Sequence, residues 1–233
     1  MTPYYSEPGI DLYLGDNREV LVALGLKPED VALLWGDPPY GVHGETDRRT
    51  RKSAVPLRRR NGREEFGVAG RKWPAVAGDD RPFDPRPWLE YPRVVLWGAN
   101  HFSHLLPPSP SWWWWDKRDG TSPDDNADGE LAWTNLGGPA RQFCHLWRGL
   151  VQASEKAHGG ARVHPTQKPE ALATWGFQRA GLKPGELVLS PWLGSGPEAA
   201  AAKRLGLRFV GIELVPEYLD ACVARLRQEI LAL

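Results

Sequence analysis

The last third of the sequence alternates between short apolar runs and segments with helical spacing. Apolar runs occur at 187–189 and 208–214, and they are followed by helix-forming segments at 198–205 and 216–231. The order strand–helix–strand–helix is typical of a parallel sheet that is covered by helices. The sequence therefore predicts an α/β fold with a doubly wound sheet.

The N-terminal part shows the same alternation. Residues 10–16 alternate in polarity like a short strand, and residues 17–26 have apolar positions at helical spacing behind Asp16 or Asn17 as the N-cap. The continuous apolar run at 31–35 predicts a strand that is buried on both faces. This part of the chain is thus expected to belong to the same sheet.

The middle of the chain is less regular. Residues 93–97 predict another buried strand, and the tryptophan-rich stretch 112–117 suits a strand by its β-propensity. Residues 118–129 are interpreted as a polar loop, residues 143–151 suit a last strand, and residues 169–180 predict a helix. A single domain over 1–233 is expected.

Charge is unevenly distributed along a chain that is neutral as a whole. The 29 basic residues balance 29 acidic ones, but residues 48–63 hold eight Lys or Arg and no acid. They lie inside the stretch 41–82, which lacks periodicity and is rich in Arg and Gly. We interpret this stretch as a long basic insertion loop on an otherwise acidic body.

Several classes of protein are disfavoured by the composition. No apolar run is long enough to span a bilayer, and the N-terminus does not resemble a signal peptide. Cys144 and Cys222 cannot build a disulfide framework, and His101 and His104 have no evident third partner for a metal. The expectations are a cytoplasmic protein, no bound metal and no membrane partner.

A glycine-rich turn lies between the strand at 187–189 and the helix that follows it. Gly194 and Gly196 allow a tight turn and close approach of a ligand to the backbone, and the helix start directs free N–H groups at that ligand. Glu213 ends the next strand, where a carboxylate can bind the ribose of a nucleoside. A simple helix start with a surface glutamate is the alternative.

The string Asp37-Pro38-Pro39-Tyr40 follows the buried strand at 31–35. A proline turn is the plain interpretation. Its chemistry also suits an exocyclic amine, whose lone pair is delocalised into its ring. A carboxylate and a backbone carbonyl that accept its two N–H bonds would turn the lone pair out of the ring plane. The tyrosine would stack on the base, which must leave its duplex stack.

These motifs occur in a characteristic order. DPPYG at 37–41, HPTQKP at 164–169, the glycine-rich turn and GIEL at 211–214 together resemble the β-class amino-methyltransferases of DNA. WGANHF, WDKRDG and ELAWTNLGGPAR are similar to a branch associated with phages and bacteria, including restriction-modification enzymes. The resemblance implies a Rossmann-like methyltransferase fold with a seven-stranded, mostly parallel sheet flanked by helices. It also implies S-adenosylmethionine as the cofactor.

The resemblance assigns roles by position. The catalytic residues would be Asp37, Pro38, Pro39 and Tyr40. The cofactor would contact Asp16, Thr166, Lys168, Ser190, Trp192, Gly194, Ser195, Gly196 and Glu213. Many relatives have Asp in place of Ser190 and Thr in place of Pro197, a departure that bears on cofactor affinity.

The motif favours methylation of adenine N6 in DNA. This chain begins the motif with Asp37, whereas the related string Ser-Pro-Pro-Tyr is linked more often to methylation of cytosine. Methylation of cytosine N4 is the closest alternative. A nicotinamide oxidoreductase, a non-catalytic DNA-binding module and an enzyme acting on an RNA or protein amine are alternatives from other classes. DNA is the expected partner, and a homodimer is left open.

The basic loop is the expected contact to the DNA backbone, since positive charges there would pair with phosphates. A solvated insertion without a role is the alternative. The residues concerned are Arg48, Arg49, Arg51, Lys52, Arg58, Arg59, Arg60 and Arg63.

Overall fold

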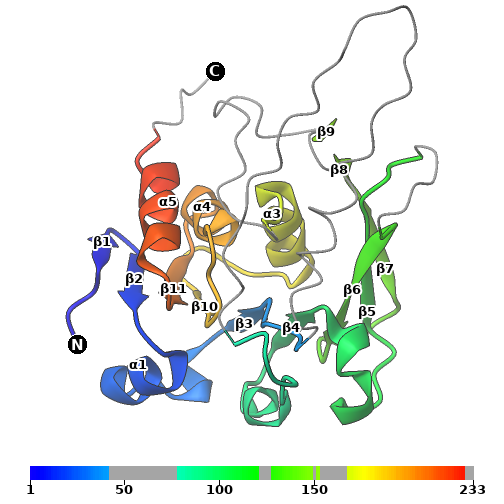
Figure 1. Cartoon of the computed structure of the whole chain (residues 1–233), viewed down its shortest axis with the longest axis horizontal. Helices are drawn as coiled ribbons and strands as arrows, with labels where there is room; N and C mark the ends of the chain where they lie inside the picture. The colour runs from blue at the N-terminus through cyan, green and yellow to red at the C-terminus, as the bar shows by residue number, and fades with distance from the viewer. Residues whose placement is uncertain (42–77, 121–126, 149–150, 153–166, 229–233) are drawn as a thin grey trace, which may run out of the picture. The chain divides into compact units, whose positions relative to one another are not determined.

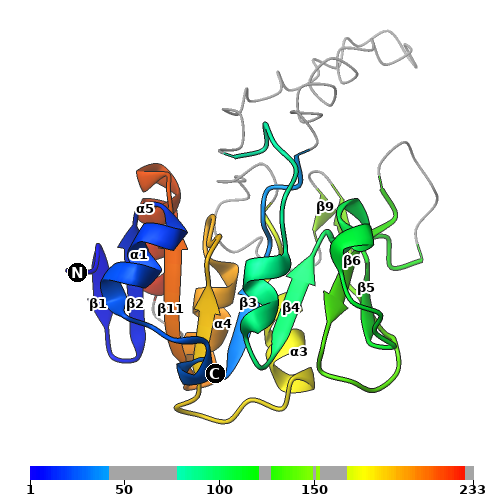
Figure 2. The ribbon, with the colours of Figure 1, turned by 90° about the horizontal axis from the view of Figure 1, so that it is seen from below.

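The computed structural model contains one large mixed sheet, whose strand order departs from the order along the chain. The structure describes residues 1–41, 78–120, 127–148, 151–152 and 167–228. Within these ranges nine strands lie side by side (Figure 2). In sheet order they are β1 (Tyr5–Glu7), β2 (Ile10–Leu14), β11 (Arg208–Glu213), β10 (Leu187–Ser190), β3 (Leu33–Gly36), β4 (Val94–Trp97), β6 (Gly129–Thr134), β5 (Trp112–Asp116) and β7 (Arg141–Cys144). A separate ribbon pairs β8 (Trp147–Arg148) with β9 (Val151–Gln152).

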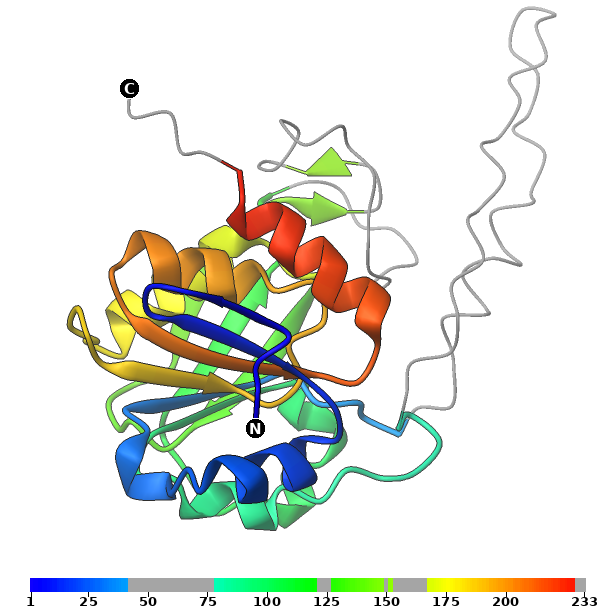
Figure 3. The same cartoon turned by 90° about the vertical axis from the view of Figure 1, so that its left-hand side faces the viewer.

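Helices cover both faces of the large sheet (Figures 1 and 3). Helices α3, α4 and α5 lie on one face, and helix α1 lies on the other together with the short 3₁₀ helix η2. Their bounds are α1 (Asn17–Leu24), α3 (Glu170–Arg179), α4 (Pro197–Arg204), α5 (Pro216–Leu226) and η2 (Arg86–Glu90). The remaining 3₁₀ turns are η1 (Pro28–Asp30), η3 (Ala99–His101) and η4 (Ser103–Leu105).

The predicted fold class is confirmed. From β2 to β5 the sheet has seven strands, of which β6 alone runs antiparallel to its neighbours. This is the seven-stranded, mostly parallel sheet that the resemblance to the DNA amino-methyltransferases implies. The additional strands extend its edges, because β1 pairs antiparallel with β2 and β7 pairs parallel with β5.

The central strands bury both of their faces. Every residue of β3, β4 and β10 is buried, as expected for apolar runs in a parallel sheet between two helical layers. In β5 the burial alternates, so that Trp113 and Trp115 are buried while Trp112 and Trp114 are half-buried. The strand expected at 112–117 is therefore confirmed, with the alternation of faces that a strand imposes.

In the middle of the chain, one strand is not predicted from the sequence and one predicted strand is wrong. The structure places β6 at Gly129–Thr134, where no strand is expected from the sequence. This segment lacks a regular alternation, and it is extended because β4 and β5 pair with it from both sides. The single strand expected over 143–151 is divided among β7, β8 and β9, and β7 starts already at Arg141.

Helix α1 begins where the sequence indicates, but it ends at Leu24, two residues before the expected bound of 26. The Asp16 side chain accepts a hydrogen bond from the Arg18 backbone N–H at 2.9 Å and so caps the first turn. Gly25 ends the helix in the left-handed conformation, with φ 61°. The last helix, α5, ends at Leu226, earlier than the expected bound of 231.

The chain divides into two compact units. One comprises Met1–Pro38 together with Asp84–Leu233, and the other comprises Pro39–Phe83. The second unit corresponds closely to the expected insertion, and its described part is a turn in which the Gly41 N–H donates to Asp79 Oδ1 at 2.8 Å. That the whole chain is one catalytic domain stays a prediction.

Among the described ranges, no helix has the length and apolar character needed to cross a membrane.

Helix α3 approaches the sheet closely at one glycine. The rings of Trp97 and Phe177 contact Trp35 edge-on, with centroids 5.8 and 5.1 Å away. A Cβ added at Gly176 would lie 2.4 Å from the Trp35 ring and 3.3 Å from the Trp113 ring. The absence of a side chain at this position lets the helix pack directly on the tryptophans.

We predict that Gly176→Ala lowers the free energy of unfolding by about 1–3 kcal/mol, because the methyl group overpacks a filled core. Urea denaturation followed by tryptophan fluorescence would measure this. Val22→Ala is the control, since Val22 is 83% exposed on α1. A Gly176→Ala variant as stable as the wild type would show that the helix can move away from the sheet.

Candidate active site

Two parallel strands end side by side at the centre of the sheet, and the helices nearest to them in the chain lie on opposite faces. Strands β10 and β3 pair in parallel, with Val188 opposite Leu33. After β10 the chain enters α4 on one face, whereas η2 lies on the other face (Figure 3). In open α/β sheets, ligands bind at the carboxyl edge where connections separate in this way.

The turn after β10 requires glycine. Gly194 and Gly196 have φ of 55° and 65°, in the left-handed region that glycine tolerates best. A Cβ at Gly196 would lie 2.1 Å from Cys222 Sγ, so the turn sits directly on α5. Ser195 between them is buried, and its Oγ has no hydrogen-bond partner among the described residues. Such an atom fits a polar ligand or a water at the turn.

Glu213 is fixed beside this turn, as the motif predicts. Its Oε2 accepts the Gly194 N–H at 2.7 Å, and its Oε1 accepts the N–H groups of Leu214 and Val215 at 2.9 Å. Burial raises the pKa of Glu213, while the three backbone donors act in the opposite direction. A carboxylate has about four lone-pair sites, so one remains for a ligand hydroxyl.

A buried carboxyl group lies behind the turn, and it belongs to a residue that the sequence analysis does not assign to the site. Glu198 stands in the first turn of α4, and its Oε1 accepts the hydroxyl proton of Ser190 at 2.8 Å. Burial raises the pKa of Glu198 from 4.5 to about 7. An acid in the first turn of a helix is common as a capping device, so the sequence alone does not indicate this role. The structure shows that Glu198 brings a carboxyl group to Ser190.

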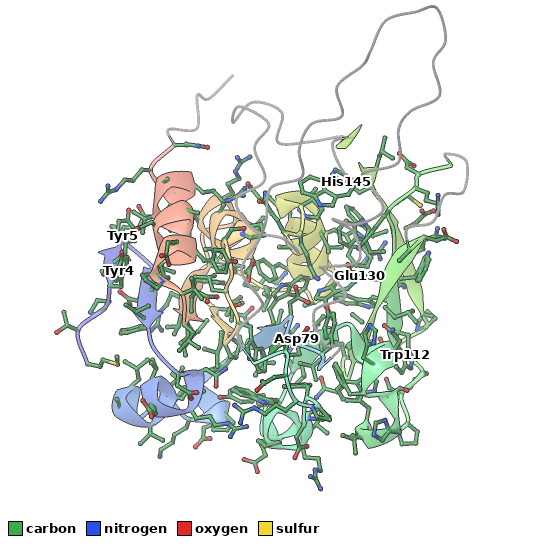
Figure 4. All side chains as sticks on the ribbon, viewed as in Figure 1. Tyr4, Tyr5, Asp79, Trp112, Glu130 and His145 are labelled. Atoms are coloured by element: carbon green, nitrogen blue, oxygen red, sulfur yellow. The ribbon has the colours of Figure 1, made fainter. Side chains whose placement is uncertain are left out.

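The acid of the Asp-Pro-Pro-Tyr motif is paired with a lysine. Asp37 follows β3, and its Oδ2 lies 2.7 Å from Lys168 Nζ. The same ammonium lies 2.7 Å from Glu130 Oε2, and Glu130 also pairs with Lys117 (Glu130 is labelled in Figure 4). Glu130 is the second site residue absent from the assigned set, because its segment is not expected to form a strand.

The charges in this group stabilise one another. Burial disfavours the charged form of Lys168, but Asp37 and Glu130 outweigh it and raise the pKa of the lysine. Burial likewise opposes the charge of Glu130, and Lys117 and Lys168 together hold its pKa below the usual range. Both groups therefore stay ionised around neutral pH.

Aromatic rings connect the glycine-rich turn with the end of β3. Trp192 lies edge-on to Trp88 of η2, with ring centroids 4.5 Å apart. A Cβ at Gly36 would come within 3.0 Å of the Trp192 ring, so this ring packs on the strand just before Asp37. At the other side of the turn, Asn17 Nδ2 donates to the Pro191 carbonyl at 3.1 Å.

The structure brings most of the assigned residues to one edge of the sheet. Lys168 contacts Asp37 and Glu130, and Asp16 caps α1. Pro39 and Tyr40 belong to the second compact unit. Thr166 and all eight basic loop residues lie outside the described residues. Within the described part of the chain, no cluster of three or more His, Cys, Asp or Glu side chains could hold a metal.

Comparison with known proteins agrees with the motifs. Residues 114–224 match the N6/N4 methyltransferase family, which is described as DNA methylase. The chain is 40% identical over 92 residues to the type II methyltransferase M2.DpnII of Streptococcus pneumoniae, a match that covers 38% of this chain and 32% of that protein. The chain thus matches about a third of the length of this relative. These matches confirm the resemblance to the amino-methyltransferases of DNA.

Solved structures share the fold. The PvuII DNA methyltransferase, described as cytosine-N4-specific, superposes with a TM-score of 0.61 at 14% identity, over 99% of this chain and 91% of that one. The putative DNA modification methylase TTHA0409 from Thermus thermophilus, in complex with S-adenosyl-L-methionine, gives a TM-score of 0.51 at 19% identity, over 92% of each chain. At these identities the likeness establishes the fold.

We predict that Glu198→Gln stabilises the protein at high pH. The folded pKa of about 7 lies above the ordinary 4.5, so the folded state keeps a proton that the unfolded state releases between these values. Stability contributed by this proton is present at low pH and is lost as pH rises through the window. Relative to the wild type, the free energy of unfolding of the variant should therefore rise by up to about 3 kcal/mol as the pH goes from about 5 to about 8.

Urea denaturation at a series of pH values would measure this difference. A stability difference that stays constant from acid to alkaline pH would contradict a buried, proton-holding Glu198.

Proposed function

We propose that this chain, which over residues 114–224 matches the N6/N4 DNA methylase family, transfers a methyl group from S-adenosylmethionine to adenine N6 in DNA. The observation that carries the proposal is the placement of Asp37 beside the glycine-rich turn. Strand β3 pairs with β10, so the acid and the turn follow neighbouring strands at the same edge of the sheet. An acceptor for an amine and a turn suited to a nucleoside cofactor are thereby combined.

The residues of the turn fit the proposed cofactor. Ser195 Oγ is a buried polar atom with no described partner, and Glu213 retains a lone-pair site for a ribose hydroxyl. The cofactor would supply an electrophilic methyl group on a positively charged sulfur. We assign cofactor binding to the residues that the sequence predicts for it, which include the turn itself and, just before it, Ser190 and Trp192. We add Glu198, whose carboxyl group accepts the hydroxyl proton of Ser190. The structural neighbour that contains this cofactor supports the assignment.

The proposed mechanism is a direct transfer. Asp37 accepts one N–H of the amine, and the backbone carbonyl of Pro38 accepts the other. Together they direct the nitrogen lone pair out of the ring plane, where it can bond to the methyl carbon. The nitrogen would gain the methyl group as the bond from that carbon to the cofactor sulfur breaks, with the electron pair of that bond left on the sulfur, and the nitrogen would release one proton to water. Tyr40 is assigned to stacking on the flipped base.

Adenine is favoured over cytosine by Asp37 itself, since cytosine N4 enzymes more often carry serine at this position. The family includes both activities, and the cytosine specificity of the PvuII enzyme belongs to a protein 14% identical to this one. A homodimer and a cytoplasmic location stay predictions.

The test of the function is methyl transfer from radiolabelled S-adenosylmethionine to DNA, followed by nucleoside analysis. Label in N6-methyladenine is the expected result. Label in N4-methylcytosine would replace the base assignment and retain the chemistry. Cofactor binding without transfer would indicate a DNA-binding module, and binding of NADH in place of S-adenosylmethionine would overturn the proposal.

We predict that Asp37→Asn lowers kcat by at least about a hundredfold, because the amine loses a charged acceptor that acts in the transition state. Cofactor affinity, measured by calorimetry, should stay close to that of the wild type. Asp84→Asn is a matched control, since Asp84 pairs with Arg86 on the surface. Methylation by Asp37→Asn at nearly the wild-type rate would sink the mechanism.

We also predict that the basic loop contacts the phosphates of DNA. Its eight positive charges stand in a chain whose remaining 21 basic residues face 29 acidic ones. Replacing Arg58, Arg59 and Arg60 with Ala should flatten the slope of log affinity against log salt by roughly two to three units.

Fluorescence anisotropy with a labelled duplex at several salt concentrations would measure this slope. The double variant Arg179→Ala and Arg208→Ala is the control, because both arginines are exposed, at the end of α3 and the start of β11. A wild-type slope in the loop variant would mean that the loop does not touch the DNA backbone.

A further inference from the structure

Four charged side chains form a connected group between the end of β3 and the hairpin of β5 and β6. In order of contact they are Asp37, Lys168, Glu130 and Lys117. We propose that Glu130 is a positioning residue for methyl transfer, and that it acts by sharing the Lys168 ammonium with Asp37. The inference rests on the proposed function, because it concerns the carboxylate that would accept the amine.

The pairing of the strands explains why these groups meet. Gly36 pairs with Leu96, so Trp97 is level with Asp37, and Trp97 is opposite Ala132 of β6. Glu130 is two residues from Ala132 and therefore shares its face of the sheet. Strand β4 ends at Trp97 while β6 continues, so Asp37 and Glu130 flank the space beyond the end of β4.

The side chain of Lys168 extends into this space, and the backbone just before it is held in place by a hydrogen bond. It stands just before α3, and the carbonyl of the preceding Gln167 accepts the indole N–H of buried Trp147 at 2.8 Å. The Lys168 side chain is 9% exposed, and its ammonium is 2.7 Å from both carboxylates. A lysine donates up to three hydrogen bonds, so one ammonium can bind two carboxylates at once.

The group is balanced, which favours a defined arrangement. Lys117 pairs with Glu130 and lies over the Trp115 ring, 4.8 Å from its centroid. Within this largely buried group two acids and two bases offset each other in charge, and removing one charge leaves its partner with less compensation. Glu130 therefore holds the Lys168 ammonium between two anions instead of leaving it to Asp37 alone.

This arrangement bears directly on the chemistry. A carboxylate that accepts an ammonium proton retains further lone-pair sites, so Asp37 can accept an amine N–H at the same time. Without Glu130, the ammonium would move fully onto Asp37 and compete with the amine. Without Lys168, Asp37 would lose the ammonium that lies 2.7 Å from its Oδ2 and that it shares with Glu130. In both cases the acceptor leaves its working position.

The experiment compares steady-state methylation by the full chain with Glu130→Gln, which retains the size of the side chain and removes its charge. We expect kcat to fall by about tenfold to a hundredfold, because a displaced acceptor loses the geometry of transfer. The KM for DNA and the calorimetric Kd for S-adenosylmethionine should change by less than about twofold. A kcat equal to that of the wild type overturns the inference.

The double variant Lys168→Met with Glu130→Gln removes one charge of each sign. It tests whether the effect of Glu130 on kcat passes through Lys168. If Glu130 acts through Lys168, Glu130→Gln should add nothing to the kcat loss of Lys168→Met. Losses that multiply overturn the inference.

Lys203→Met is the matched control, since Lys203 pairs with Glu7 at the end of α4 and should leave kcat unchanged. Near-ultraviolet circular dichroism of each variant establishes that the fold is retained. A wild-type chain that binds S-adenosylmethionine but methylates no DNA overturns the proposed function, which is a different result from an unaffected Glu130→Gln variant.

Discussion

The pairing of β10 with β3 is the contact on which the candidate active site depends. It joins segments that lie about 150 residues apart in the sequence, and it sets Leu189 opposite Leu34 in parallel. Because both strands end at the same edge, the turn after one and the acid after the other become neighbours. The continuous burial of both strands fixes their register, since any shift would expose apolar side chains or bury the polar residues that follow them.

The polar part of the site is built by a different principle. Asp37, Lys168 and Glu130 lie where β3 and β4 have stopped while β6 continues, so the sheet itself leaves room for side chains in place of a strand. Charges in such a place are costly to desolvate, and they are tolerated because each has a partner of opposite sign. Glu198 is the contrasting case, because it lies beside a hydroxyl and its pKa is raised to about 7.

The sequence predicts the parallel part of this fold well and its antiparallel part poorly. Long apolar runs, the Asp16 cap and the glycine turn are local signals, and they correctly locate β3, β10, α1 and α4. Strand β6 has no such signal, since it is extended by pairing with β4 and β5. The role of Glu130 cannot be predicted for the same reason. The contact of Glu198 with Ser190 depends on how α4 is set against β10, which no local pattern encodes.

The order of strands in the sheet also has consequences for how the chain folds. Strands β10 and β11 stand between β2 and β3, yet they come from the last fifth of the chain. During synthesis, β2 and β3 emerge early. The strands that lie between them in the sheet, β10 and β11, are complete only after about 180 further residues have been made. Contacts of such long range slow folding, and the early strands remain exposed to wrong pairing while they wait. The strands near the centre of the sheet are thus the last to be made, and they belong to the segment that carries the glycine-rich turn.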